Sequence, residues 1–174
     1  MADEIFDVVN GCDEVVRQET RKNVHRLGLK HRAVHIMVFN HKGHCFLQKR
    51  SMTKDTFPGT WDSSSSGHVD TGEHYDQCAI RELREELGLV VHEAPEALFK
   101  VEACEDTGQE FVWVYQLRSE GPFILHPEEI EQGSWFEPEV VTKWMLDKPQ
   151  EFARALVYLW PFILAHPRSF SKQT

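Results

Sequence analysis

Apolar residues occur along this chain in short runs, several of which are separated by turn-forming residues. Two pairs of runs each surround a short turn, which predicts β-hairpins: Ala33 to Asn40 with His44 to Gln48, and Ala97 to Glu105 with Glu110 to Leu117. Shorter strands are expected at Ile5 to Val9 and around Trp135 and Phe136. The pattern therefore predicts a sheet that contains hairpins.

Other segments have the pattern of helices: Val15 to Leu27, Pro138 to Leu146 and Glu151 to Ala165. Gly28 is expected to end the first of them, and Pro161 to kink or end the last. A further helix precedes Gly88, and its solvent-facing arc is expected to carry His74, Gln77, Arg81 and Arg84. Because helices alternate with strands, we expect an α/β fold with a central mixed β-sheet between helices.

The stretch from Ser51 to Gly67 is predicted to be a loop. It contains Pro58, Gly59 and a run of four serines, Ser63 to Ser66. Such a run could be low-complexity sequence. Because a carboxylate-rich segment follows it directly within one predicted domain, we interpret the run as a strand edge that enters a functional site.

Length and composition indicate a soluble globular protein. The 174 residues suffice for one domain with its own core, so we expect a single domain over residues 1–174. Within it, residues 1–30 would form a strand and helix extension, and residues 138–174 the C-terminal helices. Hydrophobic residues make up 41% of the chain and charged residues 27%, which is ordinary for this class. The net charge of −9 argues against nucleic-acid binding by a broad basic surface.

The sequence also predicts a cytoplasmic location. The four cysteines, Cys12, Cys45, Cys78 and Cys104, are scattered without a CxxC pair, as expected for reduced thiols. The N-terminal segment MADEIFDVVNG is acidic and lacks a secretory signal pattern. No apolar run approaches the ~20 residues of a membrane span.

Three acids in the helix before Gly88 provide the candidate chemistry. Glu82, Glu85 and Glu86 lie at i, i+3 and i+4 and therefore share one helix face. Like charges at this spacing repel by roughly 0.2–0.5 kcal/mol per pair, so a helix without a ligand would be more stable with Lys or Gln there. Converging carboxylates suit a hard divalent cation such as Mg²⁺ or Mn²⁺. Because Leu83 and Leu87 occupy the adjacent face, the acids are expected to border the core at a cleft wall.

The segment from Gly67 to Leu89 resembles the Nudix box, G-x5-E-x7-R-E-U-x-E-E-x-G-U, in which U is apolar. It matches at every specified position: Gly67, Glu73, Arg81, Glu82, Leu83, Glu85, Glu86, Gly88 and Leu89. Weaker similarity extends from about His31 to Val140. The resemblance implies a Nudix-type α/β/α sandwich, with the box as a loop–helix–loop, and an enzyme that hydrolyses organic diphosphates with a divalent ion.

The resemblance also implies roles within the box. The Gly67 carbonyl and the three acids occupy the family's usual metal-ligand positions: Glu82, Glu85 and Glu86. The resemblance implies four candidates for the catalytic machinery: Glu82, Glu86, Arg81 and Glu73. In several members the residue matching Glu82 is also the general base, whereas in others the base comes from elsewhere, so this role stays open. Arg81 and Glu73 would pair across the loop–helix junction and brace the motif.

A longer segment, HRAVHIMVFNHKGHCFLQKRSMTKDTFPGTWD followed by SSSSGHVDTGE, resembles the isopentenyl-diphosphate isomerase branch of the superfamily. His31 and His68 fall at metal-binding histidines of that enzyme. Arg50 and Lys54 fall where it grips the diphosphate, and Glu110 falls at one of its two acidic positions. The resemblance implies Arg50, Lys54 and His68 as substrate-binding residues and Glu110 as a further metal ligand or base, with Glu102 and Glu105 as alternatives to Glu110.

Two departures argue against the isomerase reaction. Ser66 occupies the position of the catalytic cysteine and cannot supply a low-pKa thiolate, and Gly108 occupies the position of the other acid. The box is also complete here and degenerate in the isomerase. We therefore favour a metal-dependent hydrolase of a nucleoside diphosphate-X or another organic diphosphate. An isomerase-like enzyme and a non-catalytic diphosphate-binding module are the alternatives, and the sequence leaves a homodimer open.

Replacing Glu82, Glu85 or Glu86 with Gln is expected to lower kcat by about 10²–10⁴-fold. Each change keeps the shape of the side chain and removes a negative charge from the ligand set. Steady-state kinetics with excess Mg²⁺ measures the effect, and circular dichroism checks that each variant is folded. Near-normal kcat in all three variants would contradict the assignment.

Overall fold

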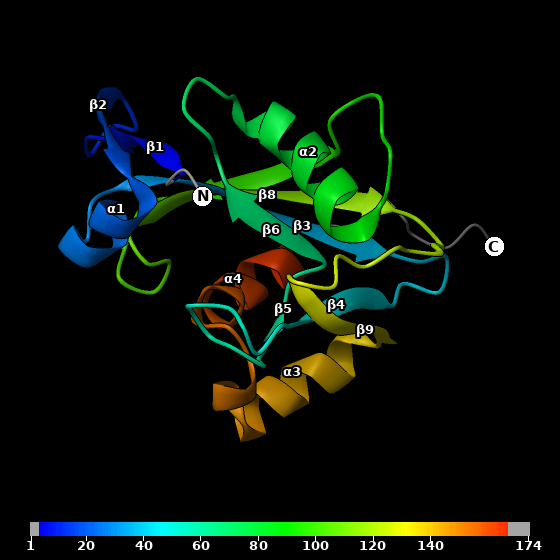
Figure 1. The fold of residues 1–174 in the computed structure, drawn as a ribbon. Helices are drawn as coiled ribbons and strands as arrows, with labels where there is room; N and C mark the ends of the chain where they lie inside the picture. Colours follow the sequence, from blue (N-terminus) through cyan, green and yellow to red (C-terminus); the bar gives the residue numbers. More distant parts are fainter. Residues whose placement is uncertain (1–3, 167–174) are drawn as a thin grey trace.

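The computed structural model of the protein describes residues 4–166 and shows a mixed β-sheet with helices on both faces (Figure 1). The strands are β1 Ile5–Val9, β2 Val15–Thr20, β3 His31–Phe39, β4 Cys45–Arg50, β5 Trp61–Asp62, β6 Ser65–His68, β7 Glu96–Val101, β8 Glu110–Arg118 and β9 Ile130–Phe136. The helices are α1 Arg21–Leu27, α2 Tyr75–Leu87, α3 Pro138–Asp147 and α4 Arg154–Ala165, with a 3₁₀ turn at Pro149–Glu151. Helix α2 covers one face of the sheet, and α3 and α4 lie on the other (Figure 1). The predicted α/β fold is confirmed.

Strand β3 organises the sheet. It pairs in parallel with β8, antiparallel with β6 along its first half, and antiparallel with β4 at its end. Strand β4 pairs in turn with β5 and β9, and β8 with β7. The registers place His31 opposite Glu110 and Ala33 opposite His68. The starts of β3 and β8 and the end of β6 therefore meet at one end of the sheet.

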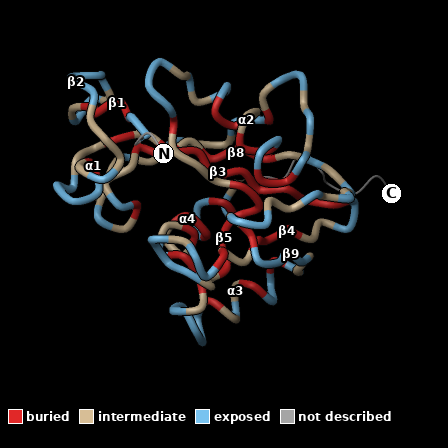
Figure 2. The backbone as a smooth tube through the Cα atoms, viewed as in Figure 1, coloured by how far each residue is buried: buried red, intermediate tan, exposed pale blue. Residues whose placement is uncertain are grey.

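The side chains of β3 supply both hydrophobic cores. Val34, Ile36 and Val38 pack beneath α2, whereas Met37 and Phe39 pack against the side of α3 and α4. Successive strand residues point to opposite faces, so a strand covered on both faces is apolar at nearly every position. Figure 2 shows the strand buried along its length. This continuous burial explains why the sequence alone identifies the strand.

The helix predicted from Val15 to Leu27 is wrong in its first half. The segment Val15–Thr20 is strand β2, which pairs antiparallel with β1, and the helix begins only at Arg21. Thr20 caps it, because its Oγ1 accepts a hydrogen bond from the Asn23 amide at 3.3 Å. Pairing with β1, a tertiary contact that helical periodicity does not encode, decides the conformation of β2. Gly28 ends α1 in the left-handed conformation, as predicted.

Strand β5 was not predicted, because it lies within the expected loop Ser51 to Gly67 and exists through its pairing with β4. The other elements agree with their predicted type and differ mainly at their ends. Both predicted hairpins form, as β3–β4 and β7–β8, and the end of the serine run enters strand β6. Strand β9 is longer than expected because it pairs along β4. Helix α4 begins at Arg154 and continues past Pro161 to Ala165. Pro161 lies on the exposed side, so packing of the opposite side keeps the helix intact.

The predicted region 138–174 extends past the described residues, which end at 166. Within residues 4–166, no helix combines the length and apolar character needed to cross a membrane.

Candidate active site

Helix α2 forms one wall of a cleft of about 510 Å³. Glu82 and Glu86 are 8% and 7% exposed, whereas Glu85 is exposed at the rim. All three line the cleft, which agrees with the expectation that the acids border the core. The helix ends at Gly88, whose positive φ of 63° gives the expected left-handed cap.

Gly67 on β6 lies directly against Glu82. A Cβ atom at Gly67 would lie 2.0 Å from Glu82 Oε1, far inside van der Waals contact. Strand β6 is held by its pairing with β3, where Gly67 lies opposite Val34. Glycine is therefore needed here so that the backbone can approach the carboxylate. The structure therefore brings Gly67 and Glu82, two residues predicted to hold the metal, against each other.

Glu86 is held from beneath by donors on the sheet. Its Oε2 accepts hydrogen bonds from Gln48 Nε2 at 3.1 Å, Ser65 Oγ at 2.8 Å and the Ser66 amide at 2.9 Å. Gln48 and Ser65 are themselves buried. The carboxylate is therefore fixed at the floor of the cleft.

Arg81 connects the acids of the box. Its guanidinium donates to Glu73 through Nε and Nη2, both at 2.9 Å, which is the predicted pairing. It also donates to Glu82 Oε1 at 2.7 Å and to Glu85 Oε2 at 3.1 Å. A further bond reaches the His68 carbonyl at 2.9 Å. The expectation that Arg81 faces solvent is wrong, because these partners draw the side chain back along the helix, where it is 26% exposed.

The pKa values of both buried acids, Glu82 and Glu86, are raised above their usual range. Burial raises the pKa of Glu82, and the nearby charge of Glu86 raises it further, although Arg81 opposes both effects. Burial likewise raises the pKa of Glu86, against the hydrogen bonds from Ser66 and Ser65. A divalent ion beside these oxygens would favour their ionised form. The all-oxygen donor set fits the preference of Mg²⁺ and Mn²⁺.

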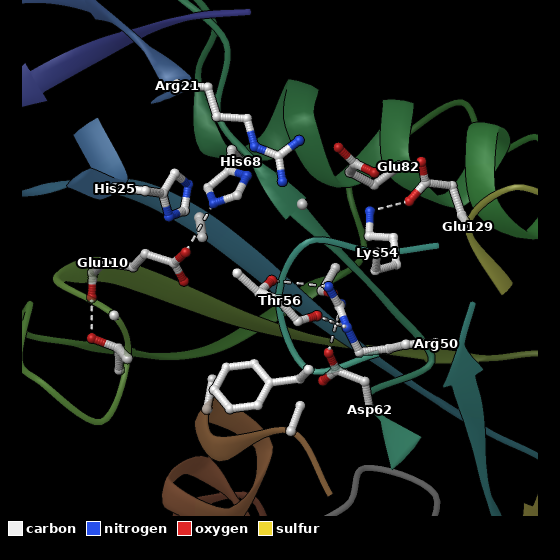
Figure 3. A pocket seen from close by; sticks show the side chains of 18 of the residues that line it. Arg21, His25, Arg50, Lys54, Thr56, Asp62, His68, Glu82, Glu110 and Glu129 are labelled. Atoms are coloured by element: carbon white, nitrogen blue, oxygen red, sulfur yellow. Dashed lines mark hydrogen bonds and ion pairs between the residues drawn. The ribbon is translucent and has the colours of Figure 1, made fainter. Parts of the chain in front are cut away.

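A cluster of histidines faces the cleft from its other end, where Figure 3 shows His25 and His68 beside Glu110. One nitrogen each of His25, His31 and His68 lies within 4.8 Å of the others. Glu110 Oε1 is 2.9 Å from His68 Nε2 and 3.5 Å from His31 Nε2. Nδ1 of His31 lies 2.9 Å from the Leu29 carbonyl and therefore donates to it, and the buried Nε2 on the other side of the ring faces Glu110.

The charge of this cluster centres on Glu110. Burial alone would raise the pKa of this carboxyl, but the imidazoles of His31 and His68 outweigh it and hold the pKa well below its usual range. Burial lowers the pKa of His68, although Glu110 opposes that effect. Of the two alternatives to Glu110, Glu105 lines the cleft edge and pairs with Arg154 at 3.3 Å. Glu110 is the acid that contacts the histidines.

The two predicted phosphate-binding residues also line the cleft. Arg50 lies 3.2 Å from Asp62 Oδ2 through Nη1 and donates to the Thr56 carbonyl at 3.1 Å through Nε (Figure 3). Lys54 pairs with Glu129, which also lines the cleft (Figure 3). Both cations therefore face a cleft whose opposite wall is acidic.

The cleft residues that were not identified from the sequence include Arg21, His25 and Glu129. Arg21 and His25 come from α1 and line the same cleft as His68 and Glu82 (Figure 3). Its guanidinium lies 3.3 Å from Glu4 and 3.1 Å from Asp55. The spacing of Arg21 and His25, one helical turn apart, is a local signal, but nothing local shows that this turn faces a cleft.

Comparison with known proteins gives the family. Residues 29–159 match the family model of the NUDIX domain. The chain belongs to the Nudix family. It is similar to an uncharacterized Nudix hydrolase of Yersinia pestis, 37% identical over 142 residues that cover 80% of this chain and 76% of the relative. The Nudix relatives identify the chain as a pyrophosphohydrolase, a class of enzyme that uses divalent metal ions.

Two solved structures share the fold of this Nudix enzyme. DR0079 from Deinococcus radiodurans superposes with a TM-score of 0.80 at 31% identity, over 91% of this chain and 98% of that one. The NUDIX domain of Shewanella oneidensis NrtR, solved with ADP ribose, gives a TM-score of 0.53 at 18% identity, over 66% and 77%. The mixed sheet and flanking helices are therefore those of Nudix proteins.

Replacing Gly67 with Ala in the Nudix enzyme is expected to lower kcat by about 10²-fold or more, because the new Cβ must displace the Glu82 carboxylate. Gly11→Ala is the matched control, since a Cβ there meets only Lys30 Nζ at 3.7 Å. Steady-state kinetics and thermal melts of both variants separate a local effect from misfolding. A fully active Gly67→Ala variant would show that Glu82 need not occupy this position.

Proposed function

We propose that this protein is a Mg²⁺-dependent pyrophosphohydrolase, active also with Mn²⁺, that cleaves a nucleoside diphosphate-X or another organic diphosphate. One observation supports it above all. A patch of oxygen atoms that can bind a metal ion shares one cleft with two cationic side chains that can bind phosphate. The ligands are Glu82, Glu85, Glu86 and the Gly67 carbonyl, and the cations are Arg50 and Lys54. Such a cleft can hold a metal and a diphosphate side by side.

The residues of the cleft have separate roles in the proposed reaction. A divalent ion supplies Lewis acidity that neutralises phosphate oxygens and makes water a better nucleophile. Glu82, Glu85 and Glu86 hold it, while Arg81, itself held by Glu73, braces Glu82. Glu82 is our candidate for the general base, and Glu129, which lines the same cleft, is the alternative from outside the box.

Arg50 and Lys54 would bind the diphosphate. Each is paired with a carboxylate in the structure, Arg50 with Asp62 and Lys54 with Glu129. Phosphate oxygens can replace such partners through charge-assisted hydrogen bonds, and the fork of Arg50 can bind two oxygens at once. We also assign substrate contact to His68, which lines the cleft at the end where it contacts Glu110 (Figure 3).

We propose a second cation position at Glu110, formed with the histidine cluster. The resemblance to the isomerase branch implies such a role for His31, His68 and Glu110, and the geometry adds His25. Bonds of about 2.1 Å to a tetrahedral ion place ligand atoms about 3.4 Å apart, close to the spacings around Glu110 Oε1. Imidazole nitrogens favour a transition metal over Mg²⁺.

We further expect one domain over residues 1–174. We also expect a cytoplasmic location, since the four cysteines are scattered along the chain without a CxxC pair. The partner is a small-molecule diphosphate, and self-association into a homodimer can be measured by sedimentation.

The hydrolase and its alternatives give different products. The purified protein should release phosphate or a monophosphate from at least one member of a panel of nucleotides, sugar nucleotides, ADP-ribose and prenyl diphosphates. A chelator should abolish this release, and Mg²⁺ or Mn²⁺ should restore it. Isopentenyl diphosphate in deuterated water should give no deuterium-labelled dimethylallyl diphosphate, because Ser66 and Gly108 replace the groups for proton transfer. Deuterium incorporation at a rate comparable to hydrolysis would favour the isomerase, and no turnover at all would favour a binding module.

Co²⁺ added to the metal-free protein should give a visible absorption spectrum from nitrogen ligation at the histidine cluster. His25→Gln should weaken this Co²⁺ binding about tenfold or more, because it removes an exposed ligand without opening the core. His92→Gln, also exposed, is the control. The Glu82→Gln variant should keep the spectrum. A spectrum that survives in His25→Gln but disappears in Glu82→Gln would place the ion at the box instead.

A further inference from the structure

Gln48 occupies a position where the pattern of β4 calls for an apolar residue. Leu47 faces the core of α3 and α4, and Phe46 faces the core beneath α2. Gln48 follows on the same side as Phe46 and is only 1% exposed. A buried amide is costly unless it is hydrogen-bonded. The residue is therefore explained by the partner that its amide contacts.

That partner is a single oxygen of Glu86. Oε2 of Glu86 receives Gln48 Nε2, Ser65 Oγ and the Ser66 amide at 2.8–3.1 Å. The donors come from β4 and β6, two strands on the floor of the cleft, and Ser65 is fully buried. Three independent donors aimed at one atom leave the carboxylate group a single orientation.

The arrangement distinguishes the two oxygens of Glu86. A carboxylate oxygen has about two lone-pair sites, so an oxygen that already accepts three hydrogen bonds has none left for a cation. Oε1 is the atom that remains for a metal ion. A ligand held in this way loses no rotamer freedom when the ion binds, which strengthens binding.

We propose that Gln48 and Ser65 are positioning residues that present Oε1 of Glu86 to the divalent ion and thereby set the affinity of the enzyme for that ion. This inference rests on the proposed function, in which Glu86 is a metal ligand. The proposal also gives a function to Ser65, one of the four serines that precede the Nudix box.

Ser64 provides a control from the same run. It is as buried as Ser65, but its Oγ donates to the Phe46 carbonyl and accepts from the Val38 amide at 2.7 Å. Its hydroxyl therefore serves the backbone of the sheet and does not contact Glu86. Ser64→Ala and Ser65→Ala remove the same atom from equally buried sites and differ in the group that loses its partner.

The test compares Gln48→Met, Ser65→Ala, Ser64→Ala and Glu86→Gln with the wild-type enzyme. Met keeps the length of Gln48 and removes its donors. Mn²⁺ binding is measured directly by electron paramagnetic resonance, and the Mg²⁺ concentration for half-maximal activity and the substrate KM at saturating Mg²⁺ are measured alongside. Thermal melts record stability, and if Gln48→Met does not fold, Ser65→Ala alone decides.

We expect Gln48→Met and Ser65→Ala each to weaken Mn²⁺ binding by about 10–100-fold at the site that Glu86→Gln removes, and to raise the Mg²⁺ requirement in parallel. Substrate KM at saturating Mg²⁺ should stay unchanged. Ser64→Ala should lower the melting temperature and leave Mn²⁺ affinity unchanged.

Two results overturn the inference and can be told apart. If Glu86→Gln weakens Mn²⁺ binding but Gln48→Met and Ser65→Ala only lower stability, their role is structural. If Glu86→Gln itself leaves Mn²⁺ binding unchanged, the metal assignment in the proposed function fails, and the inference fails with it.

Discussion

The burial of two like-charged carboxylates on one helix is the constraint on which the rest of this structure depends. Removing a carboxylate from water costs several kcal/mol per ion even after relaxation, and Glu82 and Glu86 also repel each other. Neighbouring groups each reduce part of that cost. Gly67 leaves room for the Glu82 carboxylate, Arg81 pairs with it, and Gln48 donates to Glu86. The remaining negative charge faces the cleft, where a divalent ion is the natural counter-charge.

The sheet offsets the free-energy cost of burying Glu82 and Glu86 because β3 packs apolar side chains on both of its faces. Its two apolar sides support α2 above and α4 below, so the acids are anchored to the most buried part of the fold. The same strand sets the registers that bring His31, His68 and Glu110 together from distant parts of the sequence. The two ends of the cleft, one rich in oxygen and one rich in nitrogen, are therefore fixed by one framework.

The N-terminal hairpin and helix α1 complete the cleft from outside the segment that matches the family model. Residues 29–159 contain the box, the sheet and Arg50, whereas Arg21 and His25 precede that segment. Phe6 on β1 stacks on His31 and His68 with ring centroids 5.8 and 4.7 Å away. This small unit has a core of its own around Phe6, Val8 and Val24. The packing of this N-terminal unit against the sheet therefore adds His25 to the end of the cleft that contains His31 and His68.

The sequence by itself determined the parts whose reason is local. The apolar run of β3, the hairpins and the helix of the box follow from periodicity, and the acid triplet follows from spacing along one helix. The pairing of Arg81 with Glu73 was also predicted, from the family resemblance. Tertiary structure alone decided the rest. Strand β2 exists because it pairs with β1, Arg81 turns back because acids surround it, and Glu86 is held by Gln48, which lies 38 positions away. These outcomes depend on which elements contact each other in the folded protein, and the periodicity of a helix or strand does not specify those tertiary contacts.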